Sequence, residues 1–236
     1  MTAKDIRQIL QSLAIPEIAR HSQRFFKTGP GQYGEGDLFL GIRVPKLREL
    51  AKEFRDSPLS EARRLLRSAY HEERLFALLL LVQKFSGGSA ARQKTIYEMY
   101  LKNTRYINNW DLVDLSAYLI VGSYLADKNR RPLYRLAQSE SLWERRIAII
   151  STFHFIKHNQ FADTLKIAGL LLADQEDLMH KATGWMLREV GKRDLSAEKE
   201  FLKAHYRRMP RTMLRYAIEK FPEEERRKYL KGMVAS

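Results

Sequence analysis

The stretch Asn108-Asn109-Trp110-Asp111-Leu112-Val113-Asp114-Leu115-Ser116-Ala117 lies near the middle of the chain and has the pattern of a helix start. Asn108 or Asn109 can cap the helix, because an asparagine side-chain oxygen accepts a hydrogen bond from a backbone N–H that the first turn leaves unpaired. Asp111 in the first turn suits the positive end of the helix dipole. The apolar residues that follow keep a helical spacing and predict one buried face: Leu112, Leu115, Leu119 and Ile120.

Helical spacing of apolar residues extends from this stretch over nearly the whole chain, and no run of alternating apolar residues predicts a sheet. The sequence therefore predicts an all-α fold. We expect helices over 3–13, 16–26, 45–55, 59–68, 71–85, 89–102, 109–125, 131–138, 141–157, 161–173, 175–192, 196–208 and 210–220, with a short one to about 232.

Similar apolar helices begin at residues 71, 111, 144, 181 and 213, at intervals of 40, 33, 37 and 32 residues. A drifting period of this length is typical of HEAT-type helical pairs, which stack into a curved solenoid with an extended concave face. We expect residues 1–236 to form a single domain, a solenoid of about six HEAT-like antiparallel helical pairs with a basic concave face. An irregular helical bundle is the alternative.

The chain is strongly basic, with 42 Lys and Arg against 28 Asp and Glu, a formal net charge of +14. Half of this excess lies in the last quarter, where residues 181–236 contain 15 basic and 8 acidic side chains. Such a charge is the electrostatic footprint of a nucleic-acid-binding protein. Acidic membranes and acidic proteins are alternative partners, but the sequence contains no isolated basic amphipathic helix.

The sequence contains no cysteine, which excludes disulfides and thiolate chemistry and fits a reducing cytoplasm. The N-terminus is polar, without the apolar core of a signal peptide. The longest apolar run, 75–82, is too short to span a bilayer, which takes about 20 residues. We therefore expect a cytoplasmic protein.

One glycine-rich segment, 28–37, interrupts the helical pattern. Gly29, Gly31 and Gly34 match the G-x-G-x-x-G dinucleotide-binding pattern formally. That fingerprint requires a preceding strand and a following helix, whereas a helix is predicted before this segment and Pro30 occupies a variable position. We therefore interpret the segment as a flexible surface loop.

Trp110 and Asp114 are four residues apart, so on a helix they lie one turn above the other and form a patch beside the apolar face. A solvated charge beside a tryptophan at a helix seam is the alternative. Three further segments place basic side chains at helical spacing or in pairs. They contain Arg145 and Arg146; Lys181, Trp185, Arg188 and Lys192; and Arg211 and Arg215.

No other chemistry is indicated. His154 and His158 have helical spacing, but the residues between them lack the glutamate of a zinc protease motif. The sequence shows no phosphate-binding Gly-rich loop followed by Lys-Ser/Thr and no nucleophile elbow. We therefore expect neither a metal nor a cofactor.

Three of these stretches together resemble the AlkD family of bacterial DNA alkylation-repair glycosylases, in order and spacing over nearly the whole chain. They are Trp110-Asp111-Leu112-Val113-Asp114, Arg145-Arg146-Ile147-Ala148-Ile149, and 181–189. The resemblance implies a solenoid of HEAT-like pairs with double-stranded DNA along its concave face. It also implies removal of cationic N3- or N7-alkylated purines without a base-flipping pocket.

The resemblance assigns a role to several residues. Asp114 matches the catalytic aspartate, and Trp110 and Trp185 match the tryptophans that flank the lesion's sugar. Arg146 matches an arginine at the DNA backbone, with Arg145 the second choice. A cationic purine is already a good leaving group, so one carboxylate that stabilises the sugar cation and positions water suffices. The remaining basic residues of the stripes are then candidates for DNA binding: Lys181, Arg188, Lys192, Arg211 and Arg215.

Two other functions stay open from the sequence. A non-catalytic relative that binds branched or distorted DNA would keep the basic surface without needing Asp114. A protein-binding HEAT scaffold would need an exposed apolar stripe, and we identify none. We expect a monomer, because a solenoid that holds DNA in its own groove needs no partner subunit.

Overall fold

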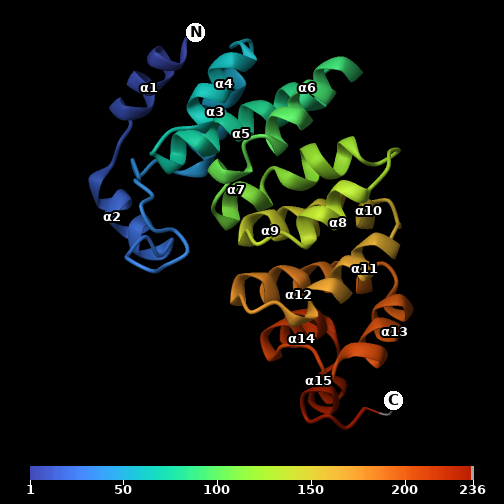
Figure 1. Cartoon of the computed structure of the whole chain (residues 1–236). Helices are drawn as coiled ribbons and strands as arrows, with labels where there is room; N and C mark the ends of the chain where they lie inside the picture. The colour runs from blue at the N-terminus through green and yellow to red at the C-terminus, as the bar shows by residue number, and fades with distance from the viewer. Residues whose placement is uncertain (235–236) are drawn as a thin grey trace. The chain divides into compact units, whose positions relative to one another are not determined.

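A computed structural model of the chain describes residues 1–234, which form two compact units, Met1–Ile120 and a second one that begins at Val121. The described residues are helical apart from loops and one isolated parallel bridge between Leu38 and Tyr70 (Figure 1). The predicted all-α fold is therefore confirmed. Within the described residues, no helix has both the length and the apolar composition that crossing a bilayer requires. The single domain and its basic concave face stay predictions.

The first unit is organised around α5, His71–Ser86, whose buried residues include the run from Leu75 to Leu81. A helix this apolar around its circumference has to be covered on several sides. It packs against α3, α4, α6 and α7. The unit contains α1 (Ala3–Ser12), α2 (Pro16–Phe25), α3 (Val44–Glu53), α4 (Leu59–Leu66), α6 (Ala90–Leu101), the short η1 (Thr104–Tyr106) and α7 (Trp110–Asp114).

The second unit is organised around α12, Asp177–Gly191, which packs against α9, α11, α13 and α14. At Gly184 the close approach to α14 requires glycine, because a Cβ atom there would lie 2.4 Å from the carbonyl oxygen of Met213. The other helices are α8 (Arg131–Ala137), α9 (Leu142–Ser151), α10 (Phe153–Lys157), α11 (Ala162–Leu170), α13 (Leu195–His205), α14 (Arg211–Ala217) and α15 (Glu223–Leu230), with η3 (Leu171–Ala173) and η4 (Ile218–Lys220).

Two predicted helices are interrupted. The segment predicted over 109–125 forms α7 only as far as Asp114 and then a π-helical turn, η2, at Tyr118–Gly122. Ser116 explains the end of α7, because its hydroxyl donates to the carbonyl of Leu112 at 2.5 Å and also contacts the Tyr100 hydroxyl at 2.9 Å. A side chain that bonds a helix carbonyl in this way competes with the backbone ladder.

The second interruption divides the helix predicted over 141–157 into α9 and α10 at Thr152. Ser151 and Thr152 are both fully buried, and their hydroxyls donate to the carbonyls of Ile147 and Ile149, each at 2.6 Å. Gly122 lies against this point, since a Cβ atom there would stand 2.2 Å from the Ser151 carbonyl oxygen. The remaining helix boundaries agree with the sequence prediction to within a few residues.

Candidate functional site

Helix α7 begins at Trp110, and its cap is Asn109, one of the two asparagines predicted for this role. Asn109 is fully buried and its side-chain oxygen accepts a hydrogen bond from the Trp110 N–H at 2.8 Å. Trp110 and Asp114 are the first and last residues of α7, one turn apart, and both are half-buried. The three residues between them are buried, so Trp110 and Asp114 share the partly open side of the helix.

Aromatic side chains from the end of α2 surround the indole of Trp110. Phe26 stacks on it with ring centroids 5.3 Å apart and 20° between the ring planes. Phe25 meets the indole edge-on at 6.0 Å and is 57% exposed. Offset-stacked and edge-on arrangements are the favourable ones for aromatic pairs. The indole is therefore held from one side while its helix remains partly open to solvent.

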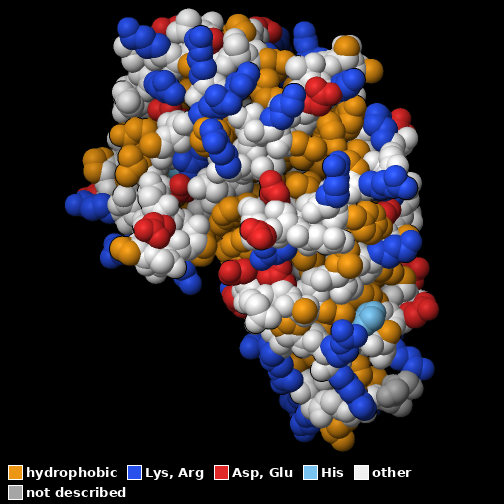
Figure 2. All heavy atoms as spheres, viewed as in Figure 1, with side chains coloured by type: hydrophobic (Ala, Val, Ile, Leu, Met, Phe, Trp, Pro, Cys, Tyr) orange, Lys and Arg blue, Asp and Glu red, His pale blue; other side chains and the backbone are white. Residues whose placement is uncertain are grey.

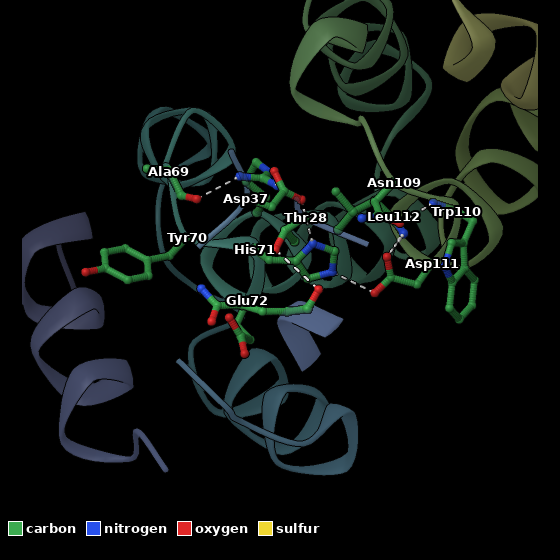
Figure 3. A network of polar contacts seen from close by, with 12 residues as sticks. Thr28, Asp37, Ala69, Tyr70, His71, Glu72, Asn109, Trp110, Asp111 and Leu112 are labelled. Atoms are coloured by element: carbon green, nitrogen blue, oxygen red, sulfur yellow. Dashed lines mark hydrogen bonds and ion pairs between the residues drawn. The ribbon is translucent and has the colours of Figure 1, made fainter. Parts of the chain in front are cut away.

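Behind α7 lies a buried polar network centred on His71, the first residue of α5 (Figure 3). The Nε2 atom of His71 lies 2.8 Å from Asp111 Oδ2, and its Nδ1 atom lies 3.3 Å from Asp37 Oδ2. Arg74 completes the network, with Nη2 at 2.7 Å from Asp37 Oδ1. All four side chains are buried.

The charges of this network set its protonation. Burial by itself would lower the pKa of the His71 imidazole, but the charge of Asp111 and hydrogen bonds to Asp111 and Asp37 outweigh it and raise that pKa to about 9. For Asp37, burial acts to raise the pKa, while His71 and Arg74 lower it, and the lowering prevails. At neutral pH His71 is thus an imidazolium between two carboxylates.

The glycine-rich loop 28–37 lies largely at the surface, with Gly34 and Asp37 buried, and its flexibility stays a prediction. Gly34 donates to the Lys27 carbonyl at 3.1 Å, and an added Cβ there would lie 2.4 Å from the Phe26 carbonyl oxygen and 3.5 Å from Asn109 Nδ2. At the end of the loop Asp37 is buried against His71, and the next residue, Leu38, accepts a hydrogen bond from the His71 N–H at 2.8 Å. The end of the loop is thereby bonded to α5, and Gly34 lies close to the start of α7.

The sequence prediction missed His71, Asp37 and the role of Asp111 toward them. The signal that could have found them is the run of four ionisable residues, 71–74, directly before an apolar run. All four are buried. Since charged side chains are almost never fully buried unless paired, such a run at the start of an apolar helix predicts a buried network.

In the second unit, Trp185 lies on α12 and is half-buried. Its indole N–H donates to Glu189 Oε1 at 3.2 Å, and Phe153 lies beside it with ring centroids 5.9 Å apart. Glu189 is buried and also pairs with Lys192 at 2.6 Å. The carboxylate of Glu189 therefore holds the N–H edge of the Trp185 indole and also neutralises the charge of Lys192.

Three of the remaining basic residues of α12 and α14 form ion pairs or contact the backbone: Lys181, Arg188 and Arg211. Lys181 pairs with Asp177 at 2.7 Å, and its side chain is 41% exposed. Arg188 pairs with Glu219 and is mostly covered. Arg211 donates to the carbonyl of Leu230, whereas Arg215 is exposed. Lys181 and Arg215 line a common hollow of about 550 Å³ with Asp177, Thr212, Tyr216, Glu219 and Arg226.

The two arginines of α9 bind protein groups within the second unit. Arg145 forms a two-point ion pair with Asp174, at 2.6 and 3.2 Å, and donates to the carbonyls of Ser139 and Glu140. Arg146 is only 5% exposed and donates to the carbonyl of Leu178 at 2.7 Å, which ties α9 to the first turn of α12. A DNA contact by either arginine stays a prediction.

Lys and Arg side chains lie over each unit on the face seen in Figure 2, and a row of them follows the edge of the second unit beside α14 and α15. This distribution agrees with the basic composition, but it does not test the predicted concave face. Trp110 and Asp114 belong to the first unit, and the other predicted site residues to the second. Within residues 1–234, no group of three or more His, Asp or Glu side chains is arranged to hold a metal ion.

Comparison with known proteins adds two findings. A family model described as DNA alkylation repair enzyme matches residues 6–221 of the chain. Among solved structures, the chain is similar to a "Predicted DNA alkylation repair enzyme from Enterococcus faecalis" with a TM-score of 0.68. The two chains are 19% identical, and the match covers 89% of this chain and 97% of that one, a likeness of fold. No curated protein matches the chain.

Proposed function

The chain belongs to the DNA alkylation repair enzyme family, and we propose that it is a monofunctional DNA glycosylase for cationic N3- and N7-alkylated purines. The family that the sequence resembled is thereby the family to which it belongs. DNA with an alkylated purine is the proposed partner. The observation that carries the proposal is the pairing of Trp110 and Asp114 on the partly open side of α7.

Asp114 is the proposed catalytic carboxylate. Alkylation at N3 or N7 makes the purine cationic, so the base leaves with the electron pair of the N-glycosidic bond as a neutral molecule. The sugar is left with oxocarbenium character at C1′, and water attacks this carbon. A carboxylate stabilises the positive charge and takes the proton that the water loses, as in glycosidases. This reaction needs neither a general acid nor a metal.

Trp110 is proposed to contact the lesion's nucleotide beside Asp114. The electron-rich face of an indole attracts a nearby cation, by roughly 0.5–2 kcal/mol. Because both the alkylated base and the developing sugar are cationic, one aromatic face assists binding and bond cleavage alike. Selectivity would then come from the lability of the cationic base, without a base-flipping pocket.

The basic side chains of the second unit are proposed to contact DNA phosphates, together with Trp185. Phosphate contacts release condensed counterions, which makes the affinity salt-dependent and largely independent of sequence. Lys181 and Arg215 are the best candidates, because they line an open hollow and are exposed wholly or in part. Arg146 and Arg145 are the weakest, because their guanidinium groups bind protein carbonyls or a carboxylate.

The test is release of free base from methylated duplex DNA by the wild type and by Asp114→Asn. We expect the wild type to release 7-methylguanine or 3-methyladenine. Asp114→Asn should release none and bind DNA equally well or slightly better, because a negative charge leaves a phosphate-rich surface. Full activity of the variant would refute the role of Asp114.

The same assay decides between the glycosylase and the non-catalytic alternative. If neither protein releases base and both bind DNA with a steep salt dependence, the glycosylase proposal fails and a protein that binds branched or distorted DNA is favoured. Binding to four-way junctions, compared with linear duplex of the same length, would then identify that function.

A further inference from the structure

We infer that His71 is a positioning residue for this centre: its ring ties Asp111, in the first turn of α7, to Asp37 at the end of the glycine-rich loop, and so orients Trp110 and Asp114. The inference deepens the proposed function and rests on it for the effect on base release. The effect on the environment of Trp110 is independent of any activity.

Asp111 transmits the position of His71 to α7. One carboxylate oxygen of Asp111 accepts from His71 Nε2 at 2.8 Å, and the other accepts from the Leu112 N–H at 2.9 Å. The carboxylate thus joins the imidazole to the backbone of a helix only five residues long. A helix this short has little intrinsic stability, so its orientation depends on such tertiary contacts. In Figure 3 Asp111 lies between His71 and Trp110.

A second route from His71 to the site runs through stacked rings. Phe39 lies 4.6 Å from the imidazole at 19°, and Phe26 lies 5.0 Å from it. Phe26 also stacks on Trp110. The position of the imidazole therefore sets the position of the indole both through Asp111 and through Phe26.

The network requires a ring that donates from both nitrogens. Ionised Asp37 and Asp111 can only accept hydrogen bonds, and an imidazole donates at both Nδ1 and Nε2 only when it is protonated. The charged groups that face the ring are Asp111 from α7, Asp37 from the loop and Arg74 from α5 itself. Two carboxylates then balance one imidazolium and one guanidinium, which is the condition for burying such charges at acceptable cost.

Loss of the His71 proton upsets this balance. One carboxylate would face a nitrogen lone pair in place of a donor, and the buried group would carry a net negative charge. An unpaired buried charge drives rearrangement. The first turn of α7 and the end of the glycine-rich loop are the segments that would move, because they supply the two carboxylates.

The network does not have the geometry of a metal site. The two ring nitrogens of His71 each face a different carboxylate, at 2.8 and 3.3 Å, so the three side chains are joined in series and do not converge on one point.

The first experiment compares His71→Gln with Glu73→Gln as a matched control. Glu73 lies on the same helix, is 1% exposed and pairs with Arg7 at 2.9 Å, but it does not contact the His71 network. We expect His71→Gln to slow single-turnover base release by about 10- to 100-fold, the loss typical of a misplaced catalytic group. Its DNA affinity should stay within about twofold of wild type, since phosphate contacts supply most of that affinity. Glu73→Gln should keep the rate.

The second experiment follows Trp110 by fluorescence in Trp143→Phe, Trp185→Phe protein, where it is the remaining tryptophan. We expect its emission to change with a midpoint near pH 9. His71→Gln should remove this transition, and Asp37→Asn, a milder change, should move its midpoint to lower pH because one attracting charge is lost.

The inference is overturned if His71→Gln slows base release no more than Glu73→Gln does, or if the Trp110 titration is the same with and without His71. If the wild type releases no base at all, the glycosylase proposal fails, and the fluorescence titration alone then decides whether His71 controls Trp110. The two failures are therefore distinguishable.

Discussion

The indole of Trp110 lies nearly parallel to the phenyl ring of Phe26, with centroids 5.3 Å apart and 20° between the planes. Phe26 is the residue that follows α2, whereas Trp110 begins α7. The contact thus joins the N-terminal part of the chain to the proposed catalytic helix. Trp110 packs between helices and also lies at a partly open surface. A tryptophan at a helix seam and a tryptophan in a functional patch with Asp114 are therefore compatible interpretations.

Replacing Phe26 by leucine should remove this stack while keeping most of the apolar volume. We expect a loss of about 1 kcal/mol in the free energy of unfolding, the usual value of such a pair, and roughly tenfold slower base release. Chemical denaturation and single-turnover kinetics measure the two effects. Phe54→Leu is the control, because it disrupts the Phe54–Phe76 pair elsewhere in the same unit and should keep the rate. Equal slowing by both variants would contradict a specific role for Phe26.

The stability of the first unit should fall in alkaline solution because of His71. Its pKa in the folded protein, about 9, exceeds the usual 6.5. The stabilisation is therefore complete below about pH 6.5 and is lost as the pH rises through 9. The full loss is on the order of 3 kcal/mol, at 1.36 kcal/mol per pKa unit. Urea unfolding at pH 6 and pH 10 measures the difference in stability. His71→Gln should abolish this difference, and the control Glu73→Gln should keep it.

Local patterns explain which parts of the site were predictable. The start of α7 depends on an asparagine cap and helical spacing within ten residues, and the sequence predicted it correctly. The end of α7 lies just before Ser116, whose hydroxyl donates to the Leu112 carbonyl and also contacts Tyr100, 16 residues away. No local pattern reveals such a contact. The same holds for His71, whose partners Asp37 and Asp111 lie 34 and 40 residues away.

The basic side chains on α12 could be predicted from the sequence, but the groups that they pair with could not. Their helical spacing was recognised, but the spacing does not reveal that Arg188 pairs with Glu219 on the neighbouring segment. Likewise Arg145 pairs with Asp174, 29 residues away. Net charge is a property of composition, whereas its distribution over the surface depends on tertiary pairing. The family resemblance was recognisable because it rests on residue identities in order and needs no such pairing.

A buried carboxyl group in the second unit predicts a loss of stability in the same direction as His71, with rising pH, but at lower pH values. Glu198 is 2% exposed, and its Oε1 atom has no hydrogen-bond partner within the described residues. Its side chain packs closely against Gly191. Burial and then the charge of Glu225 raise its pKa to about 8, although Arg188 and Lys199 act to lower it. The folded protein thus binds a proton that the unfolded chain loses near 4.5, so stability falls as the pH rises from about 4.5 to 8.

Glu198→Gln should remove that loss, since an amide is neutral at every pH. The variant should match wild type near pH 4 and exceed it at pH 9, by up to about 5 kcal/mol. Thermal or urea unfolding at the two pH values measures this. Glu200→Gln, an exposed neighbour on α13, should change little. A Glu198→Gln protein that is less stable than wild type at pH 9 would show that the carboxylate is ionised and satisfied.

Lys181 and Arg145 should differ in what their loss does to DNA binding, although the sequence proposed both as DNA contacts. Within the described residues, the guanidinium group of Arg145 binds the Asp174 carboxylate and two backbone carbonyls. Arg145→Ala should therefore lower the free energy of unfolding, because it leaves Asp174, whose side chain is 4% exposed, without its cation. The salt dependence of DNA binding should stay the same.

Lys181→Ala should have the opposite profile. The lysine side chain is 41% exposed and pairs with an exposed aspartate one turn away, an interaction of little value to stability. Its ammonium group can exchange Asp177 for a phosphate, so the slope of log K against log salt should become shallower by about one. Binding titrations between 50 and 200 mM salt, beside urea unfolding, measure both variants. A slope that Arg145→Ala changes and Lys181→Ala leaves intact would move the DNA surface of this unit from α12 to α9.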